Sequence, residues 1–280
     1  MATSATSDQL LVIIDPAARQ TDGESVRIAK DVLSAGAATK VCLPDGPAEF
    51  ARALGRRGSR RPVVIGGDRA LARAVALLHR QRDLTGCALS VVPVGQTALA
   101  ESLGVPGGTV AAARAVLEGT ARRLDLLVDD SDGVVLGALG IPPVPAGAAE
   151  PLALSPGGPW YRSLVRTLAP RPPRPAAPPS PGPARLRVEV DGETVVDLDQ
   201  PVEAVSVTPG SSGVAEVEVR PLSVGAAAAP LLAAGRTVTV TGADFRYRAD
   251  ATVSGPVRRR TWRVREAAWA LTLPTAPTGG

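Results

Sequence analysis

The sequence is poor in aromatic, histidine and cysteine residues, and each shortage excludes a class of protein. Aromatic side chains make up only 2% of the 280 residues, so the core must be built from the aliphatic part of the 45% hydrophobic content. His79 is the only histidine. A Ser-His-Asp triad is therefore excluded unless His79 serves it, and the simpler interpretation is a histidine on a helix surface. Cys42 and Cys87 stand alone, so we expect neither a structural zinc site nor a disulfide framework.

Long apolar runs and a leader sequence are also missing. No run approaches the ~20 apolar residues of a membrane-spanning helix, and the N-terminus lacks the basic and apolar regions of a secretory signal. We therefore expect a cytoplasmic protein that can touch a membrane from outside. Lysine occurs only as Lys30 and Lys40, and we interpret the excess of arginine first as codon bias.

The net charge of +4 is unevenly distributed. Residues 236–266 carry eight arginines against Asp244, Asp250 and Glu266, a local balance of +5. Such a region can attract an anionic lipid surface or nucleic acid. The simpler alternative is a solvated strand face.

The first half of the chain alternates short apolar runs with amphipathic segments. Apolar runs followed by turn residues predict strands, and apolar residues at helical spacing predict helices. The predicted strands cover 9–15, 39–44, 62–67 and 88–95, and the predicted helices cover 23–36, 47–58, 69–81, 97–103 and 109–118. This order favours a parallel sheet covered by helices, an α/β domain that we place at residues 8–138.

The pattern changes after about residue 125. Residues 124–140 predict a hairpin that turns at 130–133, and residues 160–168 predict one more helix. The proline-rich stretch 170–183 predicts an extended loop. Short alternating strands follow, separated by turns such as Asp191-Gly192. We therefore expect an antiparallel β-sandwich domain over 139–275, with a tail at 276–280.

One short stretch, "PVVIGGDRALARAV", predicts a strand, a tight turn at Gly66-Gly67-Asp68 and a helix. Unpaired amides and the helix dipole make a helix N-terminus attractive to phosphate. Arg69, however, occupies a position at which a phosphate-binding turn normally has a small side chain, so that the phosphate can approach the backbone. The same pattern also describes a tight turn without a ligand.

Several landmarks occur in a recognisable order along the chain. They are Asp15-Pro16 in "VIIDPAA", Gly66-Gly67-Asp68 in "VIGGDRA", Gly95-Gln96-Thr97 in "VPVGQTALAESLGVP", Asp125, and the later segments "SGVAEVEVRPLS", "RYRADATVSG" and "REAAWALTLP". From about residue 9 to 274, the ordered set resembles the diacylglycerol kinase and sphingosine kinase catalytic family in its bacterial lipid-kinase form.

The resemblance implies a fold and a site. The fold would be a parallel α/β domain, similar to phosphofructokinase and NAD kinase, followed by an antiparallel β-sandwich. ATP with Mg²⁺ would bind between the two, and a lipid hydroxyl would accept the phosphoryl group. The metal ligands stay unassigned, and Asp250 is the acid left to act as a base. The implied nucleotide-binding residues are Asp15, Pro16, Gly66, Gly67, Asp68, Arg69, Gly95, Gln96 and Thr97.

The departures from the family pattern fall in the motifs that the resemblance assigns to nucleotide binding and catalysis. The family's Asn-Pro is Asp15-Pro16 here, its GGDGT turn continues as Arg69-Ala70, and Ala98 stands in place of an asparagine. Its DGE motif is Asp250-Ala251-Thr252, so the expected general base is missing. Loss of a base costs ~10²–10⁴ in rate. This pattern indicates a kept fold with weakened or lost lipid-kinase activity.

Three functions therefore remain open. One is a lipid kinase with a rewired site, in which Arg69 contacts phosphate and Asp250 acts as base. Another is a non-catalytic pseudokinase that binds nucleotide, lipid or a partner. The third is binding to an anionic membrane surface through Arg258, Arg259, Arg260, Trp262, Arg263 and Arg265, unless Trp262 packs inward. We expect no specific nucleic acid partner, and a homodimer is conceivable. An NAD-kinase role fits the later motifs less well, and the first strand lacks the G-x-G-x-x-G of a dinucleotide-binding dehydrogenase.

Overall fold

The computed structural model describes residues 9–143, 184–223 and 229–275. The helix expected at 160–168, the proline-rich stretch 170–183 and the tail 276–280 lie outside these residues. The helices are α1 (Pro16–Thr21), α2 (Gly23–Gly36), α3 (Pro47–Gly55), α4 (Asp68–Arg80), α5 (Ala98–Ser102) and α6 (Thr109–Glu118). The strands are β1 (Leu10–Ile14), β2 (Thr39–Cys42), β3 (Arg61–Gly66), β4 (Ala88–Pro93), β5 (Thr120–Asp129), β6 (Val134–Val135), β7 (Leu139–Ile141), β8 (Ala184–Val190), β9 (Glu193–Val196), β10 (Pro201–Pro209), β11 (Ala215–Pro221), β12 (Leu231–Gly235), β13 (Thr237–Ala249) and β14 (Thr252–Leu273).

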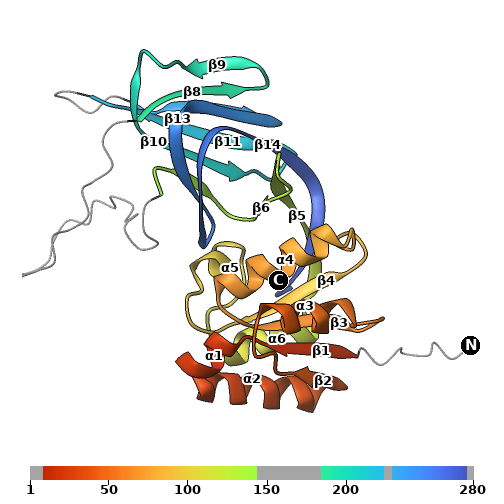
Figure 1. The fold of residues 1–280 in the computed structure, drawn as a ribbon. Coiled ribbons are helices and arrows are strands. Elements are labelled where there is room, and N and C mark those ends of the chain that lie inside the picture. Colours follow the sequence, from red (N-terminus) through yellow and green to blue (C-terminus); the bar gives the residue numbers. More distant parts are fainter. Residues whose placement is uncertain (1–8, 144–183, 224–228, 276–280) are drawn as a thin grey trace, which may run out of the picture.

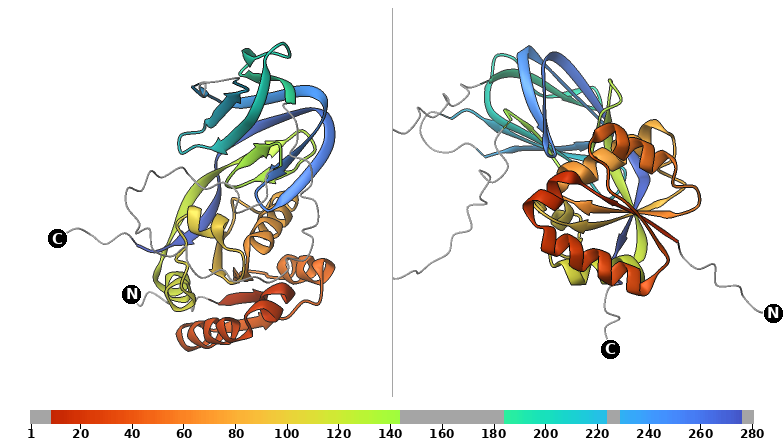
Figure 2. Two further views of the ribbon diagram at one scale, coloured as in Figure 1. Left: turned by 90° about the vertical axis from the view of Figure 1, so that its left-hand side faces the viewer. Right: turned by 60° about the horizontal axis from the view of Figure 1, so that its bottom comes forward.

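The first half of the chain forms a parallel sheet in the order β4-β3-β1-β2. Helices lie on both faces of these strands (Figure 2). Strands β1, β3 and β4 are buried because both of their faces are covered, which is why they are largely continuous apolar runs, whereas the edge strand β2 is partly exposed. The predicted strands and helices of this half are all present, and α1 is an additional short helix that begins at Pro16. Proline suits that first helical position, where no N–H is needed.

The second half is antiparallel, with the strand order β12-β11-β10-β7-β13-β14. The hairpin predicted at 124–140 is present, because Leu127 pairs with Val135 across β5 and β6. Where the sequence analysis expected short strands near the end of the chain, the structure has one strand of 22 residues, β14. The chain bulges there instead of turning, since Ala267 adopts φ 47° and donates its N–H to Asp125 at 2.7 Å.

Strand β14 joins the two halves. It pairs with β13 and β5 in the antiparallel part and continues parallel to β4. Figure 1 shows β14 and β5 running from the strand-rich half down to the helical half. Accordingly, Leu271 and Leu273 pack into the core of the parallel half, whereas Trp262 packs into the core of the antiparallel half. The division into domains at residues 8–138 and 139–275 stays a prediction, and the last strand contributes to both cores.

The sequence suggested that Arg258, Arg260 and Trp262 share an exposed strand face. This expectation is wrong for Arg260 and Trp262. Trp262 is completely buried and lies edge-on to Tyr247, with ring centroids 5.2 Å apart. The Arg260 guanidinium is largely covered and bound to Asp130. The alternative in which Trp262 packs inward is therefore confirmed. Within the described ranges, no helix is long and apolar enough to cross a membrane.

Candidate active-site cleft

The Gly66-Gly67 turn connects β3 to α4, as the sequence predicted. A Cβ on Gly67 would lie 2.6 Å from the backbone oxygen of Gln96, and a Cβ on Gly66 would lie 2.9 Å from the side chains of Ala70 and Asp15. Both glycines are thus required by close approach of neighbouring chain segments. The space beside Gly67 is occupied by the protein's own backbone.

Asp68 is the first residue of α4, and its polar groups have partners inside the protein. Its N–H donates to the carbonyl of Gln96 at 2.7 Å. Its two carboxylate oxygens accept from the N–H groups of Leu99 and Ala100 at 3.0 and 3.1 Å. The carboxylate therefore satisfies the unpaired amides at the start of α5. Asp68 fastens the turn after β3 to the loop after β4.

Arg69 is the second residue of α4 and has ordinary helical geometry. Its φ is not positive, because it lies within the regular part of α4. Its side chain is exposed, and no hydrogen bond or ion pair joins it to another residue within the described part of the chain. The helix thus accepts the arginine without backbone strain and leaves its charge unneutralised.

Asp15 ends β1 and lies beside the same turn. Its Oδ1 accepts from Nη1 of Arg73 at 3.2 Å, and the guanidinium of Arg73 also lies 5.7 Å from the ring centre of Phe50. Arg73 follows Arg69 by one helical turn, so both arginines face the same side of α4. The spacing i, i+4 could have identified Arg73 from the sequence, although we did not select it.

The third predicted segment, Gly95-Gln96-Thr97, lies next to the first two. Gly95 adopts φ 97°, a conformation that favours glycine. Gln96 supplies the carbonyl that receives the Asp68 N–H, and the Thr97 hydroxyl donates to Glu101 at 2.7 Å. The nine residues implied as a nucleotide site are therefore gathered at the ends of β1, β3 and β4. Several of their polar groups are used to hold these segments together.

Asp250 lies in the turn between β13 and β14. Its Oδ2 accepts from the N–H of Leu136 at 2.8 Å, and its Oδ1 accepts from Gly137 and Ala138 at 2.8 and 3.1 Å. Burial raises the pKa of this carboxyl, partly offset by the three N–H donors. The carboxylate holds the segment 136–138, so the prediction that it acts as a base gains no support from its contacts.

A cavity of about 310 Å³ lies between α4 and the β13–β14 turn. Two arginines of α4 face two carboxyl groups and three hydroxyl groups of the antiparallel half across it. The lining residues are Arg69, Ala72, Arg73, Ala76, Asp129, Gly133, Val134, Val135, Tyr247, Ala249, Asp250, Thr252 and Ser254. Arg69 and Asp250 thus line one cavity, and Thr252, which stands where the family resemblance would place the glutamate of DGE, lines it as well.

Asp129 and Tyr247 complete the wall opposite α4, and sequence analysis missed both as site residues. The Tyr247 hydroxyl donates to Oδ2 of Asp129 at 3.2 Å, and burial together with this carboxylate raises the pKa of Tyr247. The N–H groups of Ser131 and Gly133 each donate to Oδ1 of Asp129 at 2.8 Å. The turn "DDSDG" was visible in the sequence, but its contact with Tyr247 depends on tertiary structure.

The groups at this cleft fit ATP with Mg²⁺ poorly. Phosphate binding at a helix N-terminus needs free amides and room for the phosphate. Here the Asp68 N–H is used by Gln96, and the approach to Gly67 is filled by the same carbonyl. Among the described residues, no three acidic, histidine or cysteine side chains come together in a way that could hold a metal ion.

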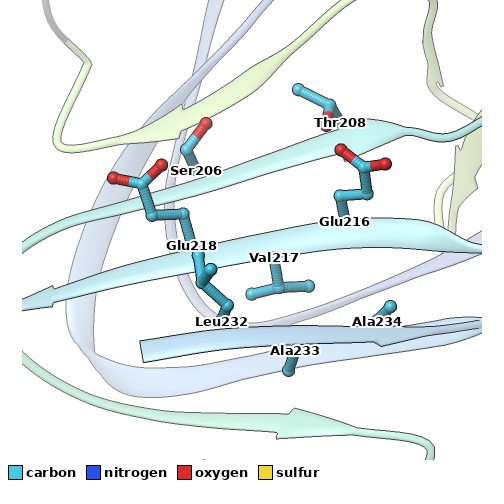
Figure 3. A pocket seen from close by; sticks show the side chains of 8 residues that line it. All are labelled: Ser206, Thr208, Glu216, Val217, Glu218, Leu232, Ala233 and Ala234. Atoms are coloured by element: carbon cyan, nitrogen blue, oxygen red, sulfur yellow. The ribbon is translucent and has the colours of Figure 1, made fainter. Parts of the chain in front are cut away.

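A second cavity lies on the outer face of β10, β11 and β12, remote from every predicted site residue. It has a volume of about 460 Å³ and is lined mainly by Glu216, Glu218, Leu232 and Ala234. Figure 3 shows both glutamates and Ser206 rising from neighbouring strands on one side of the sheet. Glu218 is already paired with Arg220 at 2.7 Å. We assign this cavity no role in the chemistry.

Comparisons with known proteins give one matching family and several solved structures of similar fold. Residues 9–128 match the family described as the diacylglycerol kinase catalytic domain. Among solved structures, two named for a diacylglycerol kinase from Bacillus anthracis str. Sterne superpose over nearly their whole length. One is 12% identical with a TM-score of 0.71 and 99% of each chain covered, and another is 15% identical with a TM-score of 0.68, covering 96% of this chain and 98% of the other.

At these identities the superpositions show the fold alone. No curated protein matches the sequence. The family match instead covers β1 to β5, which carry Asp15, the Gly66-Gly67-Asp68 turn and the segment Gly95-Gln96-Thr97. Over this segment, the chain is similar to the catalytic domain of the diacylglycerol kinase family.

Proposed function

We propose that this protein is a non-catalytic member of the lipid kinase family that binds a phosphate-bearing ligand in the cleft between α4 and the β13–β14 turn. The observation that carries the proposal is the state of Arg69. Its guanidinium is exposed at the cavity, and no described residue neutralises it. Arginine binds phosphate through charge-assisted, often bidentate hydrogen bonds. A ligand phosphate at Arg69 would supply the missing counter-charge.

Loss of phosphoryl transfer is supported by the contacts of the acidic side chains. Asp250 accepts three backbone N–H bonds with its two oxygens, and Thr252 has no proton-accepting carboxylate to offer a lipid hydroxyl. A general base must reach the proton that it removes. Asp129 is engaged by Tyr247 and the 131–133 backbone, so it is no obvious substitute.

A lipid kinase of low activity is the second candidate. It is favoured by the family match over residues 9–128 and by the raised pKa of Asp250, since a base operates best with a pKa near the working pH. In that case ATP and Mg²⁺ would be used, as the family resemblance implies. Asp250 Oδ2, which accepts a single backbone N–H bond, would then be the atom that accepts the proton from the substrate.

Binding and turnover measurements separate the two candidates. We expect at least one of four phosphate-bearing probes to bind saturably in calorimetry: ATP, ADP, glycerol 3-phosphate and short-chain phosphatidate. Labelled ATP should give no product with diacylglycerol, sphingosine or polyprenol acceptors. Arg69→Gln should weaken binding about 10- to 100-fold, as expected for a hydrogen bond between charged groups. Arg80→Gln is the matched control, because Arg80 is exposed at the far end of the same helix. Robust product formation, or no binding of any of the four probes, would overturn the proposal.

A further inference from the structure

The outward face of β14 carries a row of arginines that the cleft does not use. Side chains alternate across a strand, so residues 259, 261, 263 and 265 face away from Trp262, which points into the core. Arg259, Arg263 and Arg265 are exposed, and no hydrogen bond or ion pair connects them with any described residue. We refer to these three side chains as the β14 stripe.

Neighbouring charges on this face do not neutralise the β14 stripe. Thr241 of β13 stands in register with Arg259 on one side and with Arg187 of β8 on the other. Arg187 is paired with Asp197 at 2.9 Å and lies 4.0 Å from Glu189. The nearby acids, Glu189 on β8 and Asp197 directly after β9, are therefore matched by Arg187. The positive charge of the β14 stripe is left to attract a partner from outside.

The shape of the β14 stripe fits a planar array of anions. Alternate residues of a strand are ~7 Å apart, so Arg259 and Arg265 are separated by roughly 20 Å along β14. Thr261 lies between them in the row and is buried, and Trp262, the aromatic side chain between Arg259 and Arg265 in the sequence, points into the core. The face therefore has positive charge and no exposed aromatic side chain that could insert into the hydrocarbon region. This suits contact with lipid headgroups at the membrane surface.

Nucleic acid fits the same face less well. Single strands are usually held by aromatic side chains on which bases stack, and the β14 stripe has none. Double-stranded DNA is read by a helix or a two-stranded ribbon that enters the major groove. Strand β14 is hydrogen-bonded on both sides, to β13 and β5, so its stripe lies within a wider sheet. A flat anionic surface remains the better match.

We propose that the β14 stripe binds this protein to an anionic lipid bilayer. The interaction is electrostatic and leaves the chain outside the hydrocarbon region. The proposal stands on the exposure and pairing of three arginines and is independent of whether the cleft binds phosphate or transfers it. It assigns a membrane-facing side to the strand-rich half of the molecule.

Vesicle co-sedimentation tests the proposal directly. We expect binding to mixed phosphatidylserine–phosphatidylcholine vesicles at about 0.1 M salt, loss of binding at about 1 M salt, where screening is nearly complete within ~3 Å, and no binding to phosphatidylcholine alone. Each arginine contributes about fivefold to such binding. The triple variant R259Q/R263Q/R265Q should therefore bind about 100-fold more weakly.

A matched triple variant controls for net charge. R56Q/R82Q/R114Q removes three exposed arginines of the parallel half, so both variants have a net charge of +4 − 3 = +1. We expect this control to retain wild-type binding, and circular dichroism melts should show that both variants are folded. Equal loss in the two triple variants, absence of vesicle binding by the wild type, or stripe-dependent binding to duplex DNA without binding to vesicles would overturn the proposal.

The cleft and the β14 stripe are distinguished by measuring each variant in the assay designed for the other surface. Arg69→Gln should leave vesicle binding unchanged, and R259Q/R263Q/R265Q should leave the calorimetric affinity for soluble phosphate ligands unchanged. Failure of one proposal therefore leaves the other measurable. A parallel loss of both activities in either variant would contradict the assignment of two distinct surfaces.

Discussion

The carboxylate of Asp15 lies 3.2 Å from the guanidinium of Arg73, across the space between the end of β1 and the second turn of α4. The side chains are 11% and 34% exposed, so the pair is only partly screened by water. An acid at this position would repel a phosphate, but here its charge is used to position an arginine. The departure from the family's Asn-Pro is thus matched by a partner on the neighbouring helix.

Asp15→Asn should lower stability and strengthen anion binding at the same time. We expect a loss of about 1 kcal/mol in the free energy of unfolding, because one charged hydrogen bond is weakened at a half-screened site. Release of Arg73 and removal of one negative charge should increase the affinity for soluble phosphate ligands. Urea denaturation and calorimetry measure the two effects. Asp45→Asn is the control, since Asp45 is 89% exposed and pairs with Arg19 at 3.5 Å, and it should change neither quantity.

Gly67→Ala should destabilise the protein through a clash. The added Cβ would lie 2.6 Å from the backbone oxygen of Gln96, which is itself fixed by the Asp68 N–H. Overpacking of this kind typically costs 1–3 kcal/mol, and we expect about 2 kcal/mol here. Gly46→Ala is a matched control, because Gly46 also precedes a helix and has no atom within 4 Å of its Cβ position. Thermal unfolding of the two variants measures the difference. Equal melting temperatures of Gly67→Ala and Gly46→Ala would contradict the predicted clash.

The pKa of Asp250 makes a prediction about pH. Burial raises the folded-state pKa of Asp250 above its ordinary value of 3.8. At a pH between 3.8 and the folded-state pKa, the folded state therefore holds more protons than the unfolded state. The contribution of Asp250 to stability is therefore full below 3.8 and declines as pH rises through the folded-state pKa.

Asp250→Asn removes this titration and isolates it from other carboxyl groups. We subtract the unfolding free energy of the variant from that of the wild type. This difference should fall as the pH is raised from the acid side, because the wild type loses the contribution of Asp250. Urea denaturation across the acid range checks the sign. A difference that moves the other way would show that the three N–H donors, rather than burial, dominate the environment of this carboxylate.

Two buried tryptophans of β14 should respond differently to replacement by phenylalanine. Trp262 and Trp269 are both completely buried. Among the described residues, the Nε1 of Trp262 has no hydrogen-bond partner, whereas that of Trp269 donates to the carbonyl of Asp125 at 3.3 Å. Both variants lose similar volume, and only Trp269→Phe loses a hydrogen bond. We therefore expect Trp269→Phe to cost about 1 kcal/mol more in denaturant unfolding. Equal costs would indicate that the Asp125 contact contributes nothing.

Local sequence patterns predicted most secondary structure because they act over a few residues. The apolar run ending at Asp15 becomes β1, and the helical spacing within 23–36 becomes α2 with the same bounds. Asp22 begins α2 by accepting the N–H of Ser25 at 2.9 Å, a capping contact within one turn. The short helix α1 was missed since six residues offer too little periodicity.

Local patterns along the chain were enough to predict the alternation of helices and strands, the resemblance to a family and the positions at which the motifs depart from that family's pattern. Tertiary structure alone decided what those departures do. Asp250 is held by amides more than 110 residues earlier in the chain, and Arg73 is held by Asp15, 58 residues away. Trp262 points inward because β14 continues as one strand between two cores. Contacts of this kind depend on packing between distant segments, which no local pattern encodes.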